Sequence, residues 1–210
     1  MNPSTRTVSL TGLAGVIDAR IDEPVAGPAV GTAVIAHPHP LFGGTLDNKV
    51  VQTLARAFVQ CGWRALRFNF RGVGGSAGIH DEGRGETDDL LAVIAQAAPD
   101  GELALAGFSF GSFVVSRAMQ ALPDGREPSR LVLVGAAVRR FDVTPIPAAW
   151  HARTLVVHGE DDDTVPLADV MAWARPQALP VTVLPATSHF FHGQLQTLRY
   201  LVARHVAVTG

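Results

Sequence analysis

Short apolar runs alternate along the chain with longer segments in which apolar residues recur every three or four positions. A strand covered on both faces reads as continuously hydrophobic, whereas an amphipathic helix shows a period near 3.6. The predicted buried strands cover Val30 to Ala36, Arg64 to Phe70, Leu103 to Gly107, Leu131 to Val134, Thr154 to His158 and Val181 to Leu184. The predicted helices run from an N-cap at Asp47 to Gly62, from Glu86 to Gln96 with Thr87 as cap, from Phe110 to Leu122, from Leu167 to Ala174 and from His192 to Val206.

This alternation of strand and helix predicts an α/β fold, with a mostly parallel sheet of about eight strands and helices on both faces. Val8 to Leu10 and Gly15 to Ile21 alternate loosely around Thr11-Gly12, which predicts an antiparallel pair at one edge. Residues 136 to 153 have room for a loop with one short helix but not for a cap domain. We therefore expect a single domain over residues 1–210.

The composition and net charge of the chain disfavour nucleic acid and membranes as binding partners. Of the 210 residues 47% are hydrophobic and 17% are charged, and the formal net charge is −2. That charge offers no basic field for nucleic acid or for anionic lipid. The amino end lacks a signal-peptide core and no run approaches the ~18 apolar residues of a membrane span, so we expect a cytoplasmic protein. Cys61 is the single cysteine, which excludes an internal disulfide and is expected to be a packed thiol.

One motif stands out against this background. The sequence Gly107-Phe108-Ser109-Phe110-Gly111 follows a short apolar run and precedes a helical segment. In a tight strand-to-helix turn the central serine is pushed out above the sheet, and the flanking positions need glycine because a Cβ there meets the neighbouring chain. The context predicts that Ser109 is a nucleophile.

Two later loops supply the partners that such a serine needs. Gly159-Glu160-Asp161-Asp162-Asp163 follows one predicted strand, and Ser188-His189-Phe190 follows the last one. The carboxyl ends of parallel strands share one edge of the sheet, so serine, carboxylate and histidine are expected to meet there. The histidine accepts the hydroxyl proton, and the carboxylate orients the imidazole.

The chain resembles the small cap-less α/β-hydrolases related to dienelactone hydrolases. The matching segments span nearly the whole chain from Val30 to Val206: His37-Pro38-His39-Pro40-Leu41-Phe42-Gly43-Gly44-Thr45, Arg67-Phe68-Asn69-Phe70-Arg71-Gly72-Val73-Gly74, the serine motif, His158-Gly159-Glu160-Asp161-Asp162-Asp163-Thr164-Val165-Pro166 and Ser188-His189-Phe190-Phe191. The resemblance implies Ser109, Asp162 and His189 as catalytic residues. Asp162 follows from Gly-x-x-Asp-x-x-Val-Pro, with Asp163 and then Asp161 as alternatives. Dienelactone hydrolases proper use cysteine, so the serine favours ordinary ester hydrolysis.

An oxyanion hole in this fold takes one donor from the amide after the nucleophile, here Phe110, and another from the loop after the third strand. Pro38 and Pro40 have no N–H, which leaves His39 or Leu41 as the second donor, and the resemblance to His-Gly loops favours His39. The residues expected to wall an acyl pocket are Phe42, Phe108 and Phe190, although Phe108 and Phe190 also fit the core.

Other kinds of site are weaker interpretations. His37 and His39 lack a third clustered ligand for zinc, and the Asp161 to Asp163 run lacks the calcium-loop pattern. Arg71-Gly72-Val73-Gly74-Gly75-Ser76 does not open a helix that would receive a phosphate. His192 is interpreted as a cap or wall residue. We expect no metal and no cofactor.

The sequence thus favours a carboxylesterase that cleaves small or medium acyl esters through an acyl-enzyme. A thioesterase or acyltransferase would use the same residues. A non-catalytic binding protein is the alternative from another class, which the presence of all three residues disfavours.

Overall fold

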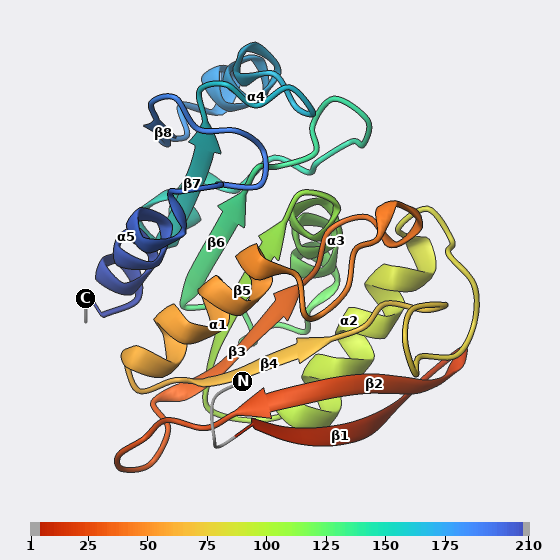
Figure 1. Cartoon of the computed structure of the whole chain (residues 1–210). Helices are drawn as coiled ribbons and strands as arrows, with labels where there is room; N and C mark the ends of the chain where they lie inside the picture. Colours follow the sequence, from red (N-terminus) through yellow and green to blue (C-terminus); the bar gives the residue numbers. More distant parts are fainter. Residues whose placement is uncertain (1–4, 208–210) are drawn as a thin grey trace.

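Eight strands form one sheet in the computed structural model, which describes residues 5–207 (Figure 1). The order across the sheet is β1-β2-β4-β3-β5-β6-β7-β8. β1 and β2 form an antiparallel pair at one edge, β2 pairs antiparallel with β4, and the remaining strands run parallel. The strands are β1 Thr5–Gly12, β2 Gly15–Asp22, β3 Gly31–Ala36, β4 Arg64–Phe68, β5 Glu102–Phe108, β6 Arg130–Val134, β7 Thr154–Gly159 and β8 Val181–Leu184.

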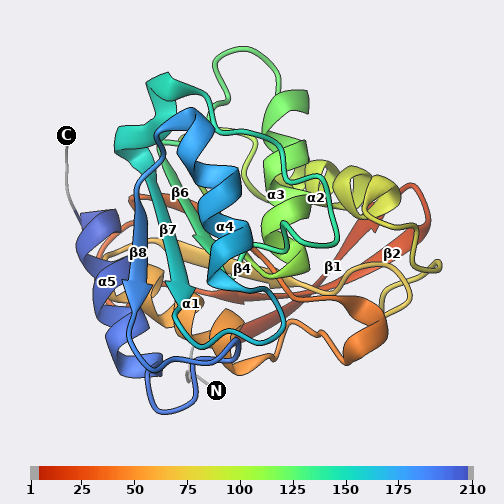
Figure 2. The same cartoon turned by 90° about the horizontal axis from the view of Figure 1, so that it is seen from above.

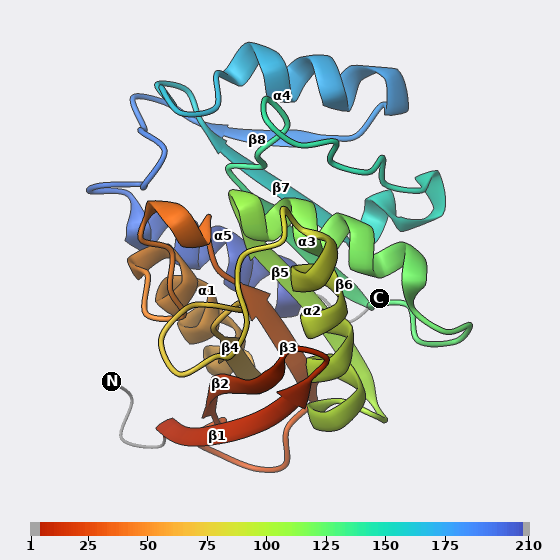
Figure 3. The same ribbon diagram turned by 90° about the vertical axis from the view of Figure 1, so that its right-hand side faces the viewer.

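Helices cover both faces of this sheet, as Figures 2 and 3 show from two further directions. Helices α1 (Lys49–Gln60) and α5 (Leu195–Ala207) pack against each other on one face. Helices α2 (Arg84–Ala97), α3 (Phe110–Ala118) and α4 (Leu167–Ala174) lie on the other. Residues 5–207 also contain four short 3-10 helices: Pro40–Phe42, Met119–Ala121, Ala148–Arg153 and Arg175–Gln177.

The hydrophobic core lies on both faces of the parallel strands. In α1 the side chains of Val51, Leu54 and Phe58, spaced by three and four residues, are fully buried. In β6 every residue after Arg130 is buried, as expected for a strand covered on both sides. Burial of these side chains removes roughly 25 cal/mol of unfavourable free energy per Å² of apolar surface, and it fixes the positions of the strands that carry the site.

The predicted fold class is confirmed. The edge pair β1-β2 is antiparallel, and α4 and β8 have the predicted bounds. The segment after β6 contains only the short helix Ala148–Arg153 before β7, so no cap domain is inserted there. Among the described residues no helix has the length and apolarity needed to cross a membrane.

The starts of α1 and α2 differ from the prediction. Asp47 is not the cap of α1: Oδ1 of Asn48 accepts the Val50 amide at 2.9 Å, while Asp47 pairs with Arg67 at 3.1 Å. Helix α2 begins earlier than expected, with Gly83 as its N-cap in a left-handed conformation. The Glu86 carboxylate accepts the Gly83 amide at 2.8 Å, as in a capping box.

Thr87 therefore lies inside α2, where its hydroxyl donates to the Gly83 carbonyl at 2.6 Å. Helix α3 ends at Ala118 and tightens into a 3-10 turn. Helix α5 begins at Leu195, after Phe191 and Gly193 have taken left-handed φ values of 54° and 75°. The backbone at His192 is thus part of a turn and not of the helix.

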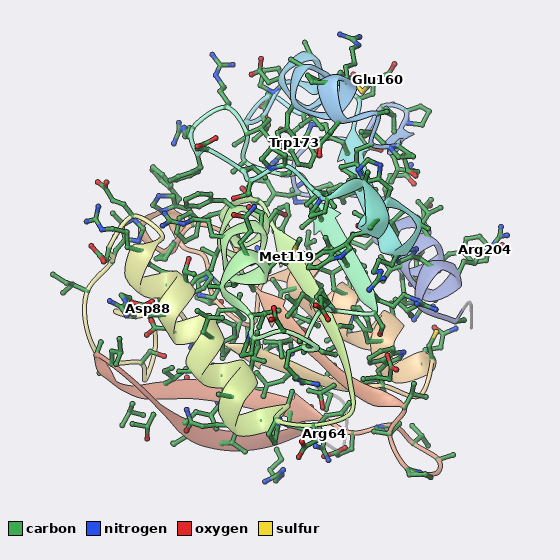
Figure 4. The ribbon with its side chains drawn as sticks, turned by 180° about the vertical axis from the view of Figure 1, so that it is seen from behind. Arg64, Asp88, Met119, Glu160, Trp173 and Arg204 are labelled. Carbon is green, nitrogen blue, oxygen red and sulfur yellow. The ribbon has the colours of Figure 1, made fainter. Side chains whose placement is uncertain are left out.

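The loops that matter for chemistry gather at one edge of the sheet. Figure 4 shows Arg64, at the start of β4, near the lower end of the molecule, and Glu160, directly after β7, at the upper end. Trp173 of α4 lies near that upper end as well. Because the strands from β3 to β8 are parallel, the loops that follow β3, β5, β7 and β8 all leave this edge.

Candidate active site

Ser109 stands in a strained turn between β5 and α3. Its φ and ψ are 55° and −117°, a region that residues with a side chain seldom occupy. A Cβ on Gly107 would lie 2.4 Å from the backbone carbonyl of Gly111, and a Cβ on Gly111 would lie 2.3 Å from the carbonyl oxygen of Ala36. The two glycines are therefore required by close approach of the backbone, and the expected strand, turn and helix are present.

A continuous chain of hydrogen bonds links three of the predicted residues. Oγ of Ser109 lies 3.1 Å from Nε2 of His189, and Nδ1 of His189 lies 2.6 Å from Oδ2 of Asp162. A carboxylate only accepts, so Nδ1 of His189 carries a proton and Nε2 is left to accept the hydroxyl proton of Ser109. All three side chains are buried, which strengthens these contacts.

Asp162 is held in place from both of its oxygens. Oδ1 accepts the amides of Thr164 and Val165 at 3.0 and 2.7 Å, which closes the turn after β7 and leaves Oδ2 for His189. Asp161 and Asp163 are exposed, and neither forms an ion pair with His189 within the described part of the chain. The geometry thus brings together Ser109, His189 and the aspartate that the sequence favours.

A second buried histidine lies beside the same carboxylate. Nε2 of His158 lies 3.5 Å from Oδ2 of Asp162 and 2.8 Å from the carbonyl oxygen of Val165. Burial lowers the pKa of His158, so the ring is neutral and donates to that carbonyl. This contact was not predicted from the sequence. The position of His158, at the end of the strand that precedes the acidic loop, could have indicated that its side chain lies near Asp162.

The loop after β3 runs alongside the serine turn. Ala36 pairs with Gly107 in the sheet, and the rings of His39 and Phe110 lie 4.9 Å apart. The Leu41 amide donates to Nδ1 of His39 at 3.2 Å, whereas the His39 amide has no acceptor among residues 5–207. Phe110 is the first residue of α3, so its amide has no carbonyl partner within that helix. Of the two loop amides considered, His39 is thus the one that is free to donate.

His37 braces this loop from within the core. It is fully buried, its Nδ1 donates to the Pro38 carbonyl at 2.6 Å, and its Nε2 accepts the Phe70 amide at 3.0 Å. Burial lowers its pKa to about 4, so the ring is neutral near pH 7. Neutral imidazole is the form that donates at one nitrogen and accepts at the other. His37 therefore connects the loop after β3 to the end of β4.

The aromatic residues expected to wall a pocket divide into two groups. Phe42 and Phe190 are exposed, and the Phe190 ring lies 5.2 Å from that of His189. Phe108 is fully buried, 5.0 Å from the His189 ring, so it supports the imidazole from the core and has no surface for a ligand. Phe190 also lines a groove of about 310 Å³ together with Thr45, Asp47, Asn48, Lys49, Val50 and His192.

Sequence reasoning missed a cluster on the other side of the serine turn. The ring of His39 lies 4.8 Å from His80, 4.8 Å from Phe42 and 5.8 Å from Phe141. Nδ1 of His80 lies 2.8 Å from Oε1 of the buried Glu86. These residues come from separate loops and from α2, so no local pattern connects them. Within residues 5–207 no three acidic, histidine or cysteine side chains gather in a way that would hold a metal ion.

The mostly parallel sheet, the strained serine turn and the hydrogen-bonded serine, histidine and aspartate define the α/β-hydrolase class. The chain belongs to the family of serine hydrolases described as serine aminopeptidase, S33, whose sequence profile matches residues 42–153. An uncharacterised protein of Rickettsia prowazekii (strain Madrid E) is 31% identical, over 78% of this chain and 69% of that protein.

Two bacterial proteins of known structure share this fold over nearly their whole length. XC6422 from Xanthomonas campestris, described as an α/β serine hydrolase without lid, is 37% identical, with a TM-score of 0.85 over 98% of this chain and 95% of its own. An α/β serine hydrolase homologue from Coxiella burnetii is 35% identical, with a TM-score of 0.84 over 96% of this chain and 97% of its own. The similarity to both thus covers at least 96% of this chain and not only the serine turn.

Proposed function

We propose that this chain is a carboxylesterase that hydrolyses small or medium acyl esters through a covalent acyl-enzyme. The unbroken connection from Ser109 through His189 to Asp162 carries this proposal. In it Ser109 is the nucleophile, His189 the general base and then the general acid, and Asp162 the residue that orients and stabilises the imidazolium. All three residues lie in loops that follow strands at the same edge of one sheet. Because one sheet carries the whole site, the arrangement also supports a single hydrolase domain over residues 1–210.

In the first half of the reaction, Oγ of Ser109 forms a bond to the ester carbonyl carbon while Nε2 of His189 takes the hydroxyl proton. The tetrahedral oxyanion then collapses, the bond to the alcohol oxygen breaks, and His189 returns the proton to the departing alcohol. In the second half water takes the place of the serine hydroxyl. His189 accepts a proton from that water, and the acid leaves as Ser109 recovers its proton.

The oxyanion is stabilised, in this proposal, by the amides of Phe110 and His39. Phe110 directly follows Ser109, and the ring of His39 lies 4.9 Å from that of Phe110. Donors fixed before the reaction stabilise developing charge without reorganisation. Leu41 is the weaker candidate because its amide already donates to the His39 ring. Phe42, near His39, and Phe190, near His189, provide exposed apolar surface for the substrate.

Ester cleavage fits the surroundings of Ser109 better than removal of an N-terminal amino acid. An aminopeptidase must accept a protonated amino group close to the scissile bond. Here an exposed cation, the guanidinium of Arg140, lies over the Phe42 ring, with its Cζ 5.4 Å from the ring centre. Like charges repel, so beside Phe42 a neutral or anionic ester is favoured over a protonated amine.

A fluorophosphonate probe and an aryl ester test the proposal together. Intact mass and peptide mapping should place one phosphonyl group on Ser109, and the Ser109→Ala variant should lose labelling and ester turnover while its circular dichroism stays unchanged. Labelling at Cys61, or wild-type turnover by the variant, would show that the assignment is wrong. Parallel assays with a matched thioester and with an aminoacyl anilide distinguish the alternative activities.

A further inference from the structure

Arg140 is an exposed cation beside Phe42, and the proposed mechanism gives it no role. It belongs to the loop after β6, and its guanidinium lies over the ring of Phe42. Phe42 in turn packs edge-on against His39 at 4.8 Å, and His39 carries the proposed oxyanion amide. This cation–π contact holds the guanidinium on the Phe42 ring, and Phe42 connects it to the loop that carries His39.

The charge of Arg140 is not neutralised by the described part of the chain. No carboxylate of residues 5–207 lies within ion-pair distance of it, whereas its neighbour Arg139 lies 4.0 Å from Asp169. The acidic group closest to the cluster, Glu86, is fully buried. Its oxygens accept the amides of Asp81 and Gly83 and contact His80, so Glu86 is already occupied by its own loop.

The imidazole of His39 provides a hydrogen-bond donor close to the Arg140 cation. Nδ1 of His39 accepts the Leu41 amide, so in the neutral ring the proton is on Nε2. Burial, and after it His80 and Arg140, lower the pKa of His39, while Glu86 opposes the shift. His39 is therefore a neutral donor near pH 7, and the permanent charge beside it is that of Arg140.

We propose that Arg140, stacked on Phe42 next to His39, forms a carboxylate subsite, and that the preferred substrates are esters carrying a second, ionised carboxyl group. The proposal rests on the hydrolase function proposed above and names its substrate class. A planar guanidinium matches a carboxylate through two parallel hydrogen bonds, which a lysine does not reproduce. The apolar part of such a substrate would cover the exposed ring of Phe42.

The test compares two esters of equal chain length that differ in charge, monoethyl adipate and ethyl hexanoate, with hydrolysis followed by proton release. The wild type should favour the adipate ester in kcat/KM. Arg140→Gln should lower the ratio of the two kcat/KM values about tenfold, mainly through the KM of the adipate ester, and Arg140→Lys should recover part of it. Arg139→Gln is the matched control and should leave the ratio at the wild-type value. A wild-type preference for hexanoate, or an equal loss in both arginine variants, overturns the proposal.

Binding separates this proposal from the hydrolase function. The Ser109→Ala variant should bind monoethyl adipate in calorimetry, and adding Arg140→Gln should weaken the Kd about tenfold. If neither ester is hydrolysed but this difference in Kd persists, the subsite stands and the assigned reaction is wrong. If both esters are hydrolysed and the two Kd values agree, the reaction stands and the subsite is wrong.

Discussion

Oδ2 of Asp162 lies 2.6 Å from Nδ1 of His189, while the two neighbouring carboxylates of the same loop face solvent. The difference comes from the turn after β7. Because Oδ1 of Asp162 accepts two backbone amides of that turn, only this carboxylate is directed at the imidazole. The loop thus presents three adjacent aspartates but one acceptor for His189.

Replacing Asp162 by Asn should reduce kcat for an activated ester on the order of 10⁴-fold, as loss of the orienting carboxylate does in serine triads. The Asn oxygen still accepts the amides of Thr164 and Val165, but its NH₂ group then faces Nδ1 and favours the wrong tautomer of His189. Asp161→Asn and Asp163→Asn are matched controls that should stay close to wild-type activity. If Asp163→Asn lost its activity and Asp162→Asn stayed active, Asp163 and not Asp162 would be the residue that orients His189.

The second proposed oxyanion donor, the backbone amide of His39, can be deleted by substitution with proline. The proposed reaction does not use the His39 side chain. His39 has φ −54° and ψ 124°, values that proline also adopts, so His39→Pro deletes the amide N–H with little change in the backbone. We expect kcat to fall by roughly 10² to 10³-fold, the usual cost of one oxyanion donor. His39→Ala keeps the amide and separates that loss from the loss of the imidazole. Equal kcat values in the two variants would exclude the His39 amide from the oxyanion hole.

His37 should make the fold sensitive to acid. Its pKa is lowered from 6.5 to about 4 in the folded chain, so between these values the unfolded chain binds a proton that the folded chain does not. The free energy of unfolding should therefore fall as the pH drops from about 6.5 to 4, by up to about 3 kcal/mol from this residue. His158 and His205, whose pKa values burial also lowers, act in the same direction.

Urea unfolding at several pH values between 4 and 7 measures this dependence. The control is His37→Gln, which retains an acceptor for the Phe70 amide and a donor for the Pro38 carbonyl but does not titrate. Its unfolding free energy should vary less with pH than that of the wild type, even if it is lower throughout. An unchanged slope in the variant would mean that another group causes the acid sensitivity.

Local patterns were sufficient for most of the fold and for the central residues of the site. The strand before Ser109, the glycines on either side of it and the helix after it constrain one another within a short segment, so their arrangement could be predicted. The end of β4 was predicted less well, because the strand stops at Phe68 and not at Phe70. The amides of Asn69 and Phe70 donate instead to the Asp18 carbonyl and to His37, which are both distant in sequence.

The cap of α1 shows the same limit. Asp47 is a good N-cap by residue type, but its carboxylate is engaged by Arg67 of β4, and Asn48 takes its place. The cluster around His39 could not be inferred either, because His80 and Arg140 belong to loops that are far from His39 in the sequence. Residues whose positions depend on long-range contacts are the ones that the sequence alone did not assign.

The backbone of the serine turn also limits which nucleophiles the protein can use. At φ 55° a residue with one γ atom is already strained, and a β-branched one is a genuine outlier. Threonine is therefore a poor replacement for Ser109, even though it offers the same hydroxyl. Cysteine has a single γ atom and meets the steric requirement, and His189 is placed to take a proton from either group. Exchange of one atom, oxygen for sulfur, is thus the change of nucleophile that this turn most readily permits.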